Sequence, residues 1–121
     1  MTLEPNVIVL YVDDIALSSQ FYTDLLGLSS VEASPTFTAF KLANGMGVGL
    51  KAKHSVKPAA ESCGGIELAF TVKSNEQVDG LYADWERCGI RIAQPPSDLP
   101  FGYTFLAQDP DGHRLRVVAL K

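Results

Sequence analysis

Cysteine and histidine are scarce in this 121-residue chain, which contains two of each. Cys63 and Cys88 are too few for a disulfide framework, and residues 1–6 have neither the basic nor the apolar region of a secretion signal. Because disulfides form mainly in exported proteins, both thiols are expected to be reduced. These shortages argue against a disulfide-stapled secreted protein and predict a cytoplasmic location.

Basic residues and long apolar segments are also lacking. Lysine and arginine number 10 against 14 acidic residues, which gives a formal net charge of −4. Binding to nucleic acid or to an anionic membrane surface requires a basic face, which this balance does not predict. The longest apolar stretches, about seven residues, are far shorter than the roughly 20 that cross a bilayer. We therefore expect neither nucleic acid nor a membrane among the partners.

What the sequence does contain is a repeat with an offset of sixty residues. Residues 7–12 and 67–72 are runs of apolar, β-branched and aromatic side chains, and each predicts a strand. A helix is expected after each strand, over residues 15–26 in the first copy and after Ser74 in the second. Gly27 supplies the left-handed residue that ends the first helix.

Capping residues and apolar spacing support both helices. Asp13 or Asp14 can cap the first helix, and Ser74 and Gln77 form a capping-box pair at the start of the second. The side chains expected on the apolar stripes are Leu17, Phe21, Tyr22 and Leu25 in the first helix, and Val78, Leu81, Tyr82, Trp85 and Cys88 in the second. Both stripes are expected to pack on a sheet.

Three further strands are expected after each helix. Their ranges are 29–33, 37–42 and 46–52 in the first half and 90–93, 103–108 and 113–120 in the second. Residues 95–100 are expected to form a loop, because proline cannot pair regularly inside a sheet. The polar stretch 53–65 predicts a linker between modules of about 1–56 and 62–121. The sequence thus predicts one α+β domain over residues 1–121, two βαβββ modules forming a cupped mixed sheet.

Strand alternation predicts a second, open face on each module, away from its helix. That face combines apolar groups with a few charges, a mixture that is typical of small-molecule sites. Gly47 and Gly49 either leave room there for a ligand or mark a bulge or bend. The residues expected to bind a ligand are Val7, Val9, Phe37, Gly49, Lys51, Glu67, Thr104, Leu106 and Arg116.

Two motifs carry a resemblance to a known family. Residues 21–28, Phe-Tyr-Thr-Asp-Leu-Leu-Gly-Leu, resemble the first-helix signature of the vicinal oxygen chelate superfamily. Residues 109–113, Asp-Pro-Asp-Gly-His, resemble its C-terminal signature. The superfamily includes glyoxalases, dioxygenases and drug-binding resistance proteins, so the resemblance implies a fold more firmly than a function.

The resemblance also implies where the enzymes of the superfamily hold a divalent metal. In this sequence those positions fall on Val7, Gly49, Glu67 and Arg116. A single oxygen ligand with a cation beside it is too little for a divalent ion. His54, in the expected linker, and His113, at the turn, do not complete the set. We therefore expect no metal, no cofactor and no catalytic residue.

Among relatives without the metal, the chain is most similar to antibiotic-binding resistance proteins of the phenazine type. The similar stretches are Glu67, residues 78–85 and residues 101–106. This resemblance implies non-catalytic binding of a flat aromatic molecule. It also implies a homodimer with two equivalent clefts, with or without exchange of modules between the two chains. Lys51 falls at the position where these resistance proteins are expected to have an aromatic residue that stacks on the ligand, so the identity of the ligand stays open.

Three functions remain open at this point. The first is sequestration of a planar aromatic antibiotic-like molecule, with Phe37 packing on the ligand, Arg116 or Lys51 pairing its carboxylate or phenolate, and residues 95–103 closing over it. The second is a lyase or isomerase of glyoxalase or dioxygenase type with Glu67 as base. The third is a regulatory or structural domain. In the metal's place, Glu67 and Arg116 are expected to form an ion pair.

Overall fold

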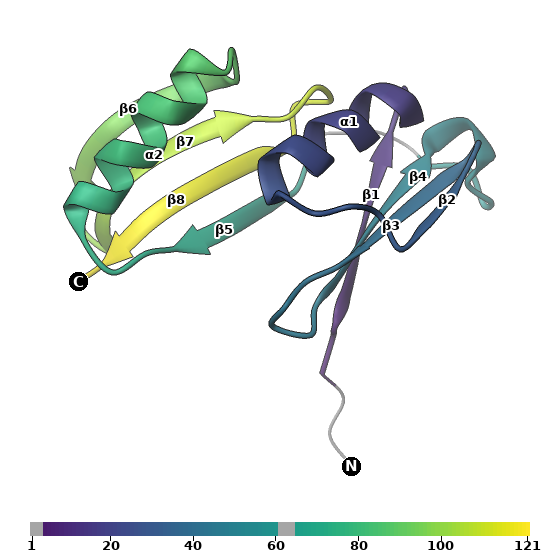
Figure 1. The fold of residues 1–121 in the computed structure, drawn as a ribbon, viewed down its shortest axis with the longest axis horizontal. Helices are drawn as coiled ribbons and strands as arrows, with labels where there is room; N and C mark the ends of the chain where they lie inside the picture. The colour runs from purple at the N-terminus through teal and green to yellow at the C-terminus, as the bar shows by residue number, and fades with distance from the viewer. Residues whose placement is uncertain (1–3, 61–64) are drawn as a thin grey trace. The chain divides into compact units, whose positions relative to one another are not determined.

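The computed structural model describes residues 4–60 and 65–121, so Cys63 and part of the predicted linker lie outside the described residues. The chain divides into two compact units, residues 1–63 and 64–121. Each unit contains one of the predicted βαβββ modules (Figure 1). The α+β class and the order of the elements are confirmed. Within the two described ranges, no helix is long and apolar enough to cross a membrane.

The first unit is a four-stranded mixed sheet with one helix. Its elements are β1 (Val7–Val12), α1 (Ile15–Leu26), β2 (Glu32–Ser34), β3 (Phe37–Lys41), β4 (Gly47–Ala52) and a 3₁₀ turn (Lys53–Ser55). The strand order is β1-β4-β3-β2, with β1 parallel to β4 and the other pairs antiparallel. A parallel pair needs a long crossover, which α1 and the two following strands supply.

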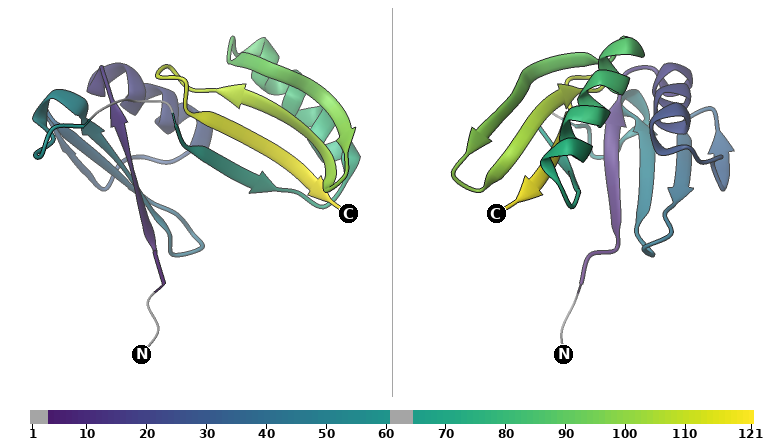
Figure 2. Two further views of the ribbon diagram at one scale, coloured as in Figure 1. Left: turned by 180° about the vertical axis from the view of Figure 1, so that it is seen from behind. Right: turned by 60° about the vertical axis from the view of Figure 1, so that its left-hand side comes forward.

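The second unit repeats this arrangement. Its elements are β5 (Glu67–Thr71), α2 (Asn75–Arg87), β6 (Arg91–Leu99), β7 (Gly102–Gln108) and β8 (Arg114–Leu120). The order β5-β8-β7-β6 again places the first and last strands in a parallel pair. Helix α2 contacts β6, β7 and β8 on one face of the sheet (Figures 1 and 2).

Helix α1 begins and ends where the sequence predicts, and it buries Tyr22 of the predicted stripe but not Leu17. The Asp14 carboxylate accepts a hydrogen bond from Leu17 N at 3.0 Å, and Gly27 has a φ of 66°. The fully buried side chains are Ser18 and Tyr22, whereas Leu17 is 56% exposed, so the predicted place of Leu17 on the packed stripe is wrong. A hydrogen bond of 2.7 Å between Ser19 and Thr38 of β3 joins the helix to the sheet on the observed face.

Helix α2 packs through aromatic contacts. Ser74 Oγ accepts from Gln77 N at 3.2 Å, but the Gln77 side chain accepts from Lys73 N rather than closing a capping box on Ser74. Trp85 is buried and meets Phe70 and Phe105 edge-on, at centroid distances of 5.8 and 5.3 Å. Cys88, predicted on the same stripe, is exposed at the C-cap, where the helix has already ended.

The clearest correction concerns residues 95–100, predicted as a loop. Strand β6 continues to Leu99 and includes Pro95 and Pro96. It is an edge strand, and its pairing with β7 shifts register between Ile92 and Gln94 and again between Gln94 and Ser97. Edge position and bulges are the settings in which a strand tolerates proline. A loop over residues 95–103 that closes on a ligand is therefore not present.

The remaining strands differ from prediction only at their ends. The largest shift is in β2, predicted over residues 29–33 and observed at Glu32–Ser34. This strand is short and exposed along its length, so its sequence has no apolar alternation to define the pairing. The predicted linker opens with the 3₁₀ turn Lys53–Ser55.

Candidate functional site

The face of the first sheet that α1 does not cover, the first open face, is defined by the strand register. Its rows are Tyr11, Lys51 and Phe37, then Val9, Gly49 and Ala39, then Val7, Gly47 and Lys41. Leu10 and Val12 are fully buried on the other side, and Val7, Val9 and Tyr11 are exposed, as the alternation predicts. The register therefore places Val7, Val9, Phe37, Gly49 and Lys51 on one face.

The Phe37 ring lies against Gly49. A Cβ atom at Gly49 would lie 2.9 Å from Phe37 Cζ, 3.0 Å from its Cε1 and 3.5 Å from a Val9 methyl. Both neighbouring strands keep their register past Gly49, so this glycine does not mark a bulge. The space that it leaves is filled by the Phe37 ring. An aromatic surface on the sheet, rather than a hole in it, is what the first open face offers to a ligand.

The face of the second sheet that α2 does not cover, the second open face, carries the predicted ion pair. Arg116 Nε donates to Glu67 Oε2 at 3.2 Å, with Arg116 of β8 and Glu67 of β5 on adjacent strands. The contact uses one nitrogen rather than the expected two-pronged fork. The Glu67 side chain is 43% exposed and that of Arg116 16%, so water reaches the carboxylate. The pair is closer to a surface pair than to a buried one.

Thr104 accepts a hydrogen bond from a second nitrogen of the Arg116 guanidinium. Its hydroxyl is fully buried, donates to the carbonyl oxygen of Val117 at 2.7 Å and accepts from Arg116 Nη1 at 3.1 Å. Leu106 lies directly opposite Arg116 on β7 and is buried. The structure thus brings together Glu67, Thr104, Leu106 and Arg116, as the alternation predicts.

Phe101 is a candidate site residue that the sequence interpretation did not assign. Its ring centroid lies 5.3 Å from Arg116 Cζ, within the range of a cation–π contact. The available signal was an aromatic residue between Pro100 and Gly102, where a tight turn exposes its side chain. Tyr11, in the same row as Lys51, was placed on the open face but not in the site.

The turn that carries Phe101 is held at two points. A Cβ atom at Gly102 would lie 2.3 Å from the Ala119 carbonyl oxygen, so the two backbones meet where only glycine fits. Tyr103 donates to Asp79 Oδ1 of α2 at 2.7 Å, and this bond is the main cause that raises the pKa of Tyr103. The turn is therefore fixed to both β8 and α2.

The residues at the superfamily's metal positions do not fit a divalent ion. Val7 and Gly49 have no side-chain donor atom, and Glu67 is bonded to the Arg116 cation. Among residues 4–60 and 65–121, no three His, Cys, Asp or Glu side chains gather into a possible ligand set. His113 is buried in the turn, where its backbone N–H donates to Asp109 Oδ1 at 2.8 Å. No step that runs through a metal follows from these side chains.

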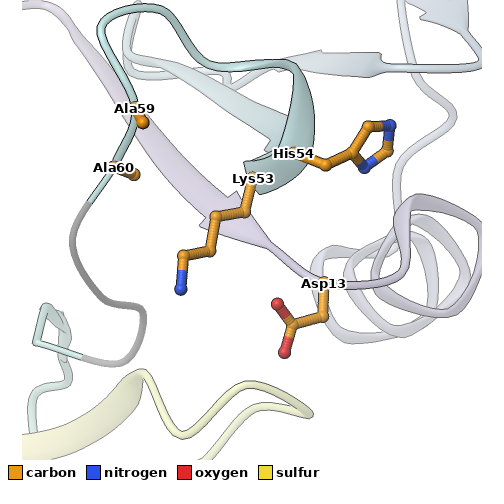
Figure 3. Close-up of a pocket in the computed structure, with 5 residues that line it drawn as sticks. All are labelled: Asp13, Lys53, His54, Ala59 and Ala60. Atoms are coloured by element: carbon orange, nitrogen blue, oxygen red, sulfur yellow. The ribbon is translucent and has the colours of Figure 1, made fainter.

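A separate hollow of about 360 Å³ lies at the ends of β1 and β4 (Figure 3). Its described lining consists of Asp13, Lys53, His54, Ala59 and Ala60. This lining shares no residue with the predicted site. Its described lining combines two charged side chains with a histidine and two alanines, and it contains no Phe, Tyr or Trp ring on which a planar aromatic ligand could pack.

Comparison with known proteins agrees with this geometry. Residues 5–117 match the Glyoxalase/Bleomycin resistance protein/Dioxygenase superfamily. The chain is 32% identical to the phenazine antibiotic resistance protein EhpR of Enterobacter agglomerans over 98% of its own length and 94% of the relative's. A protein of Agrobacterium tumefaciens solved by solution NMR is 50% identical, with a TM-score of 0.92 and 99% of each chain covered.

A glyoxalase/bleomycin resistance protein/dioxygenase from Nocardioides shares the fold at 23% identity, with a TM-score of 0.85 over 99% of this chain and 85% of the other. The family match covers nearly the whole chain, and the EhpR alignment extends over both modules. The chain therefore belongs to the glyoxalase/bleomycin resistance protein/dioxygenase superfamily.

Proposed function

We propose that the protein binds a small planar aromatic molecule without transforming it. The observation that carries the proposal is Arg116: it stands at a metal position of the superfamily's enzymes and is bonded to Glu67 and Thr104. A cation at this position repels a divalent ion, and without that ion the site lacks the catalytic chemistry that the metal would provide. What remains is a binding surface with aromatic and cationic groups.

The ligand class is inferred from two sources. The relative at 32% identity is a phenazine antibiotic resistance protein, and phenazines are flat aromatic molecules. The open faces offer complementary groups, since the Phe37 ring lies against Gly49 and Phe101 lies beside Arg116. Aromatic rings gain both burial and favourable ring contacts from such neighbours. We propose that each open face carries groups that suit such a ligand.

One observation favours a second function. The Glu67 side chain is 43% exposed and accepts a hydrogen bond from Arg116 Nε, so its carboxylate can reach a substrate. A general base needs this access. A lyase or isomerase of glyoxalase type that uses Glu67 as base is therefore the alternative.

The test combines binding with recovery of the ligand. The purified protein is titrated with phenazine-1-carboxylate in a thermal-shift assay and by calorimetry. A ligand at one hundred times its Kd stabilises the native state by about 2.7 kcal/mol, which raises the melting temperature clearly. The bound molecule is then released and analysed by mass spectrometry. Unchanged ligand supports sequestration, a changed molecule supports the enzyme, and no shift with any planar aromatic probe contradicts the proposal.

We further propose that the protein acts as a cytoplasmic homodimer. Strands β1 and β5 each pair with a neighbour on one side within their own sheet, and such edges favour pairing with other strands. The exposed Val7 and Val9 of β1 add apolar surface to that edge strand. Light scattering at micromolar concentration is expected to give twice the chain mass of 13.1 kDa. A mass of a single chain under these conditions contradicts the dimer.

A further inference from the structure

The buried hydroxyl of Thr104 can act only as a hydrogen-bond acceptor toward Arg116. A hydroxyl carries a single proton, and Thr104 donates it to the Val117 carbonyl at 2.7 Å. Its oxygen therefore faces Arg116 Nη1 only as an acceptor, at 3.1 Å. Because the side chain is fully buried, the oxygen cannot exchange this bond for water without moving the strand.

Arg116 is consequently held from two directions. Nη1 donates to Thr104 on β7 and Nε donates to Glu67 on β5, so the strands on either side of β8 fix the plane of the guanidinium. A guanidinium has five N–H groups, and these two bonds use two of them. Within the described ranges, the other three have no bonded partner.

The surroundings of the guanidinium are apolar. Ala69 and Leu106 stand beside Arg116 in the same row of the sheet, and the Phe101 ring lies 5.3 Å from its central carbon. A small inorganic anion gains nothing from these groups, whereas an aromatic ring bonded to a carboxylate would bury surface against them. Lys51, the other cation considered, stands between Tyr11 and Phe37 on a flexible stem, which suits a point charge more than a planar group.

We infer that Thr104 is a positioning residue that presents Arg116 to the carboxylate of a planar aromatic acid, and that this contact sets the ligand preference of the site. The inference rests on the proposed function and narrows its ligand class from planar aromatics to aromatic acids. Glu67 offsets part of the charge of Arg116, so the preference for an acid over its neutral amide is expected to be moderate, about tenfold.

The test compares phenazine-1-carboxylate with phenazine-1-carboxamide, which has the same ring system and no charge. In the wild type the carboxylate is expected to bind about tenfold more tightly, as measured by calorimetry. Thr104→Val keeps the size of the side chain and removes the acceptor, so the preference should fall to about twofold or less. Thr104→Ser keeps the hydroxyl and should retain the preference, which separates positioning from packing.

A second measurement monitors the Arg116 side chain directly by NMR. The ¹Hε–¹⁵Nε NMR signal of Arg116 should be sharp and shielded from solvent exchange in the wild type and in Thr104→Ser. In Thr104→Val it should exchange faster, because one of the two anchors is gone. Titration with benzoate should shift this signal in the wild type and much less in Thr104→Val. This measurement needs no phenazine, so it tests the inference even if sequestration of phenazines is wrong.

The two failures are distinguishable. If neither phenazine binds but benzoate shifts the Arg116 signal in a Thr104-dependent way, the proposed function fails for phenazines and the inference stands. Equal affinity for acid and amide, a preference that survives Thr104→Val, or an Arg116 signal that ignores benzoate overturns the inference. Loss of the preference in Lys51→Met alone, with Thr104→Val unaffected, also overturns it, because the charge would then be recognised on the first open face.

Discussion

The two open faces have the same strand register, but equivalent positions on them carry side chains of different chemistry. The sixty-residue offset pairs Val9 with Ala69, and their strand partners are Gly49 and Arg116. On the third strand of each module, Phe37 and Thr104 occupy equivalent register positions, each diagonal to that partner. In the first module a ring therefore lies against a glycine, and in the second a hydroxyl holds a guanidinium.

This difference shows how a duplicated fold can carry different groups at equivalent positions of its two modules. Strand register fixes where side chains point, and it is the same in both modules. The residues at those points are independent of the core, since Leu10 and Val12 of β1 and Leu115 and Val117 of β8 are fully buried on the opposite faces. An aromatic surface and a charged receptor can therefore arise on equivalent positions without disturbing either core.

The largest effect is expected where the second module is most tightly constrained. Gly102→Ala would place a Cβ atom 2.3 Å from the rigid Ala119 carbonyl oxygen, so the backbone must shift. We expect the free energy of unfolding in urea to fall by about 3 kcal/mol, at the upper end of overpacking costs. Gly80→Ala, in open space on α2, is the matched control and should stabilise by about 0.5–1 kcal/mol. Equal effects of the two changes would contradict the close approach.

On the first open face the corresponding effect is on binding. Phe37→Ala removes the ring that lies against Gly49, and the affinity for a bound phenazine should fall about tenfold, or roughly 1.4 kcal/mol. Phe37→Leu keeps apolar volume without the ring and should lose less. Calorimetry gives both affinities, and near-ultraviolet circular dichroism checks that the fold is intact. Unchanged affinity in Phe37→Ala would mean that this face does not touch the ligand.

The Glu67–Arg116 pair is expected to contribute less to stability than a buried pair would. Water reaches Glu67, whose side chain is 43% exposed, so a double-mutant cycle of Glu67→Gln and Arg116→Met should give a coupling energy of about 0.5 kcal/mol. Denaturant unfolding of the four proteins measures it. A coupling of about 3 kcal/mol or more would show that the pair is desolvated in solution, and strict additivity would show that it does not form.

The order of the elements and the faces of β1, β5 and β8 were predictable because local signals and alternation agree. Apolar runs, the Asp14 cap and Gly27 define β1 and α1 to the residue, and alternation along β5 and β8 puts Glu67 and Arg116 on one face. The ion pair was expected because the family resemblance puts Glu67 and Arg116 at two metal positions that converge on one ion, and the structure contains the pair.

Contacts between distant segments were not predictable. Whether Pro95 and Pro96 lie in a strand depends on β6 being an edge with shifted register, which only the partner strand decides. Strand alternation does not fix which nitrogens of Arg116 are used, and the structure has Nε bonded to Glu67 and Nη1 to Thr104, twelve residues away. The burial of Ser18 rather than Leu17 on α1 reflects how the helix packs on the sheet, which it contacts through the hydrogen bond between Ser19 and Thr38 of β3. Each is a tertiary contact that overrides a local preference.

The smallest effect concerns the tether of the Phe101 turn, Tyr103 to Asp79. The hydrogen bond to that carboxylate, followed by burial and by the charges of Asp79 and Asp98, raises the pKa of Tyr103. Because the folded-state pKa lies above that of the unfolded chain, the contribution to stability is complete below about pH 10 and is lost as the pH rises through the folded-state value. Wild type should therefore lose stability at alkaline pH more steeply than Tyr103→Phe, in urea unfolding from neutral to alkaline pH.

Tyr82→Phe is the control for this tether. Tyr82 donates to Glu86 within α2, and its pKa is also raised by that bond, but it does not connect the helix to the turn. Both variants should flatten the alkaline limb, whereas only Tyr103→Phe should loosen Phe101 and broaden the Arg116 Nε–Hε signal. That outcome would show that the position of Phe101 and Arg116 on the second open face depends on the hydrogen bond from Tyr103 to Asp79 of α2. An Arg116 signal that is the same in both variants would show instead that Gly102 and β8 alone position the turn.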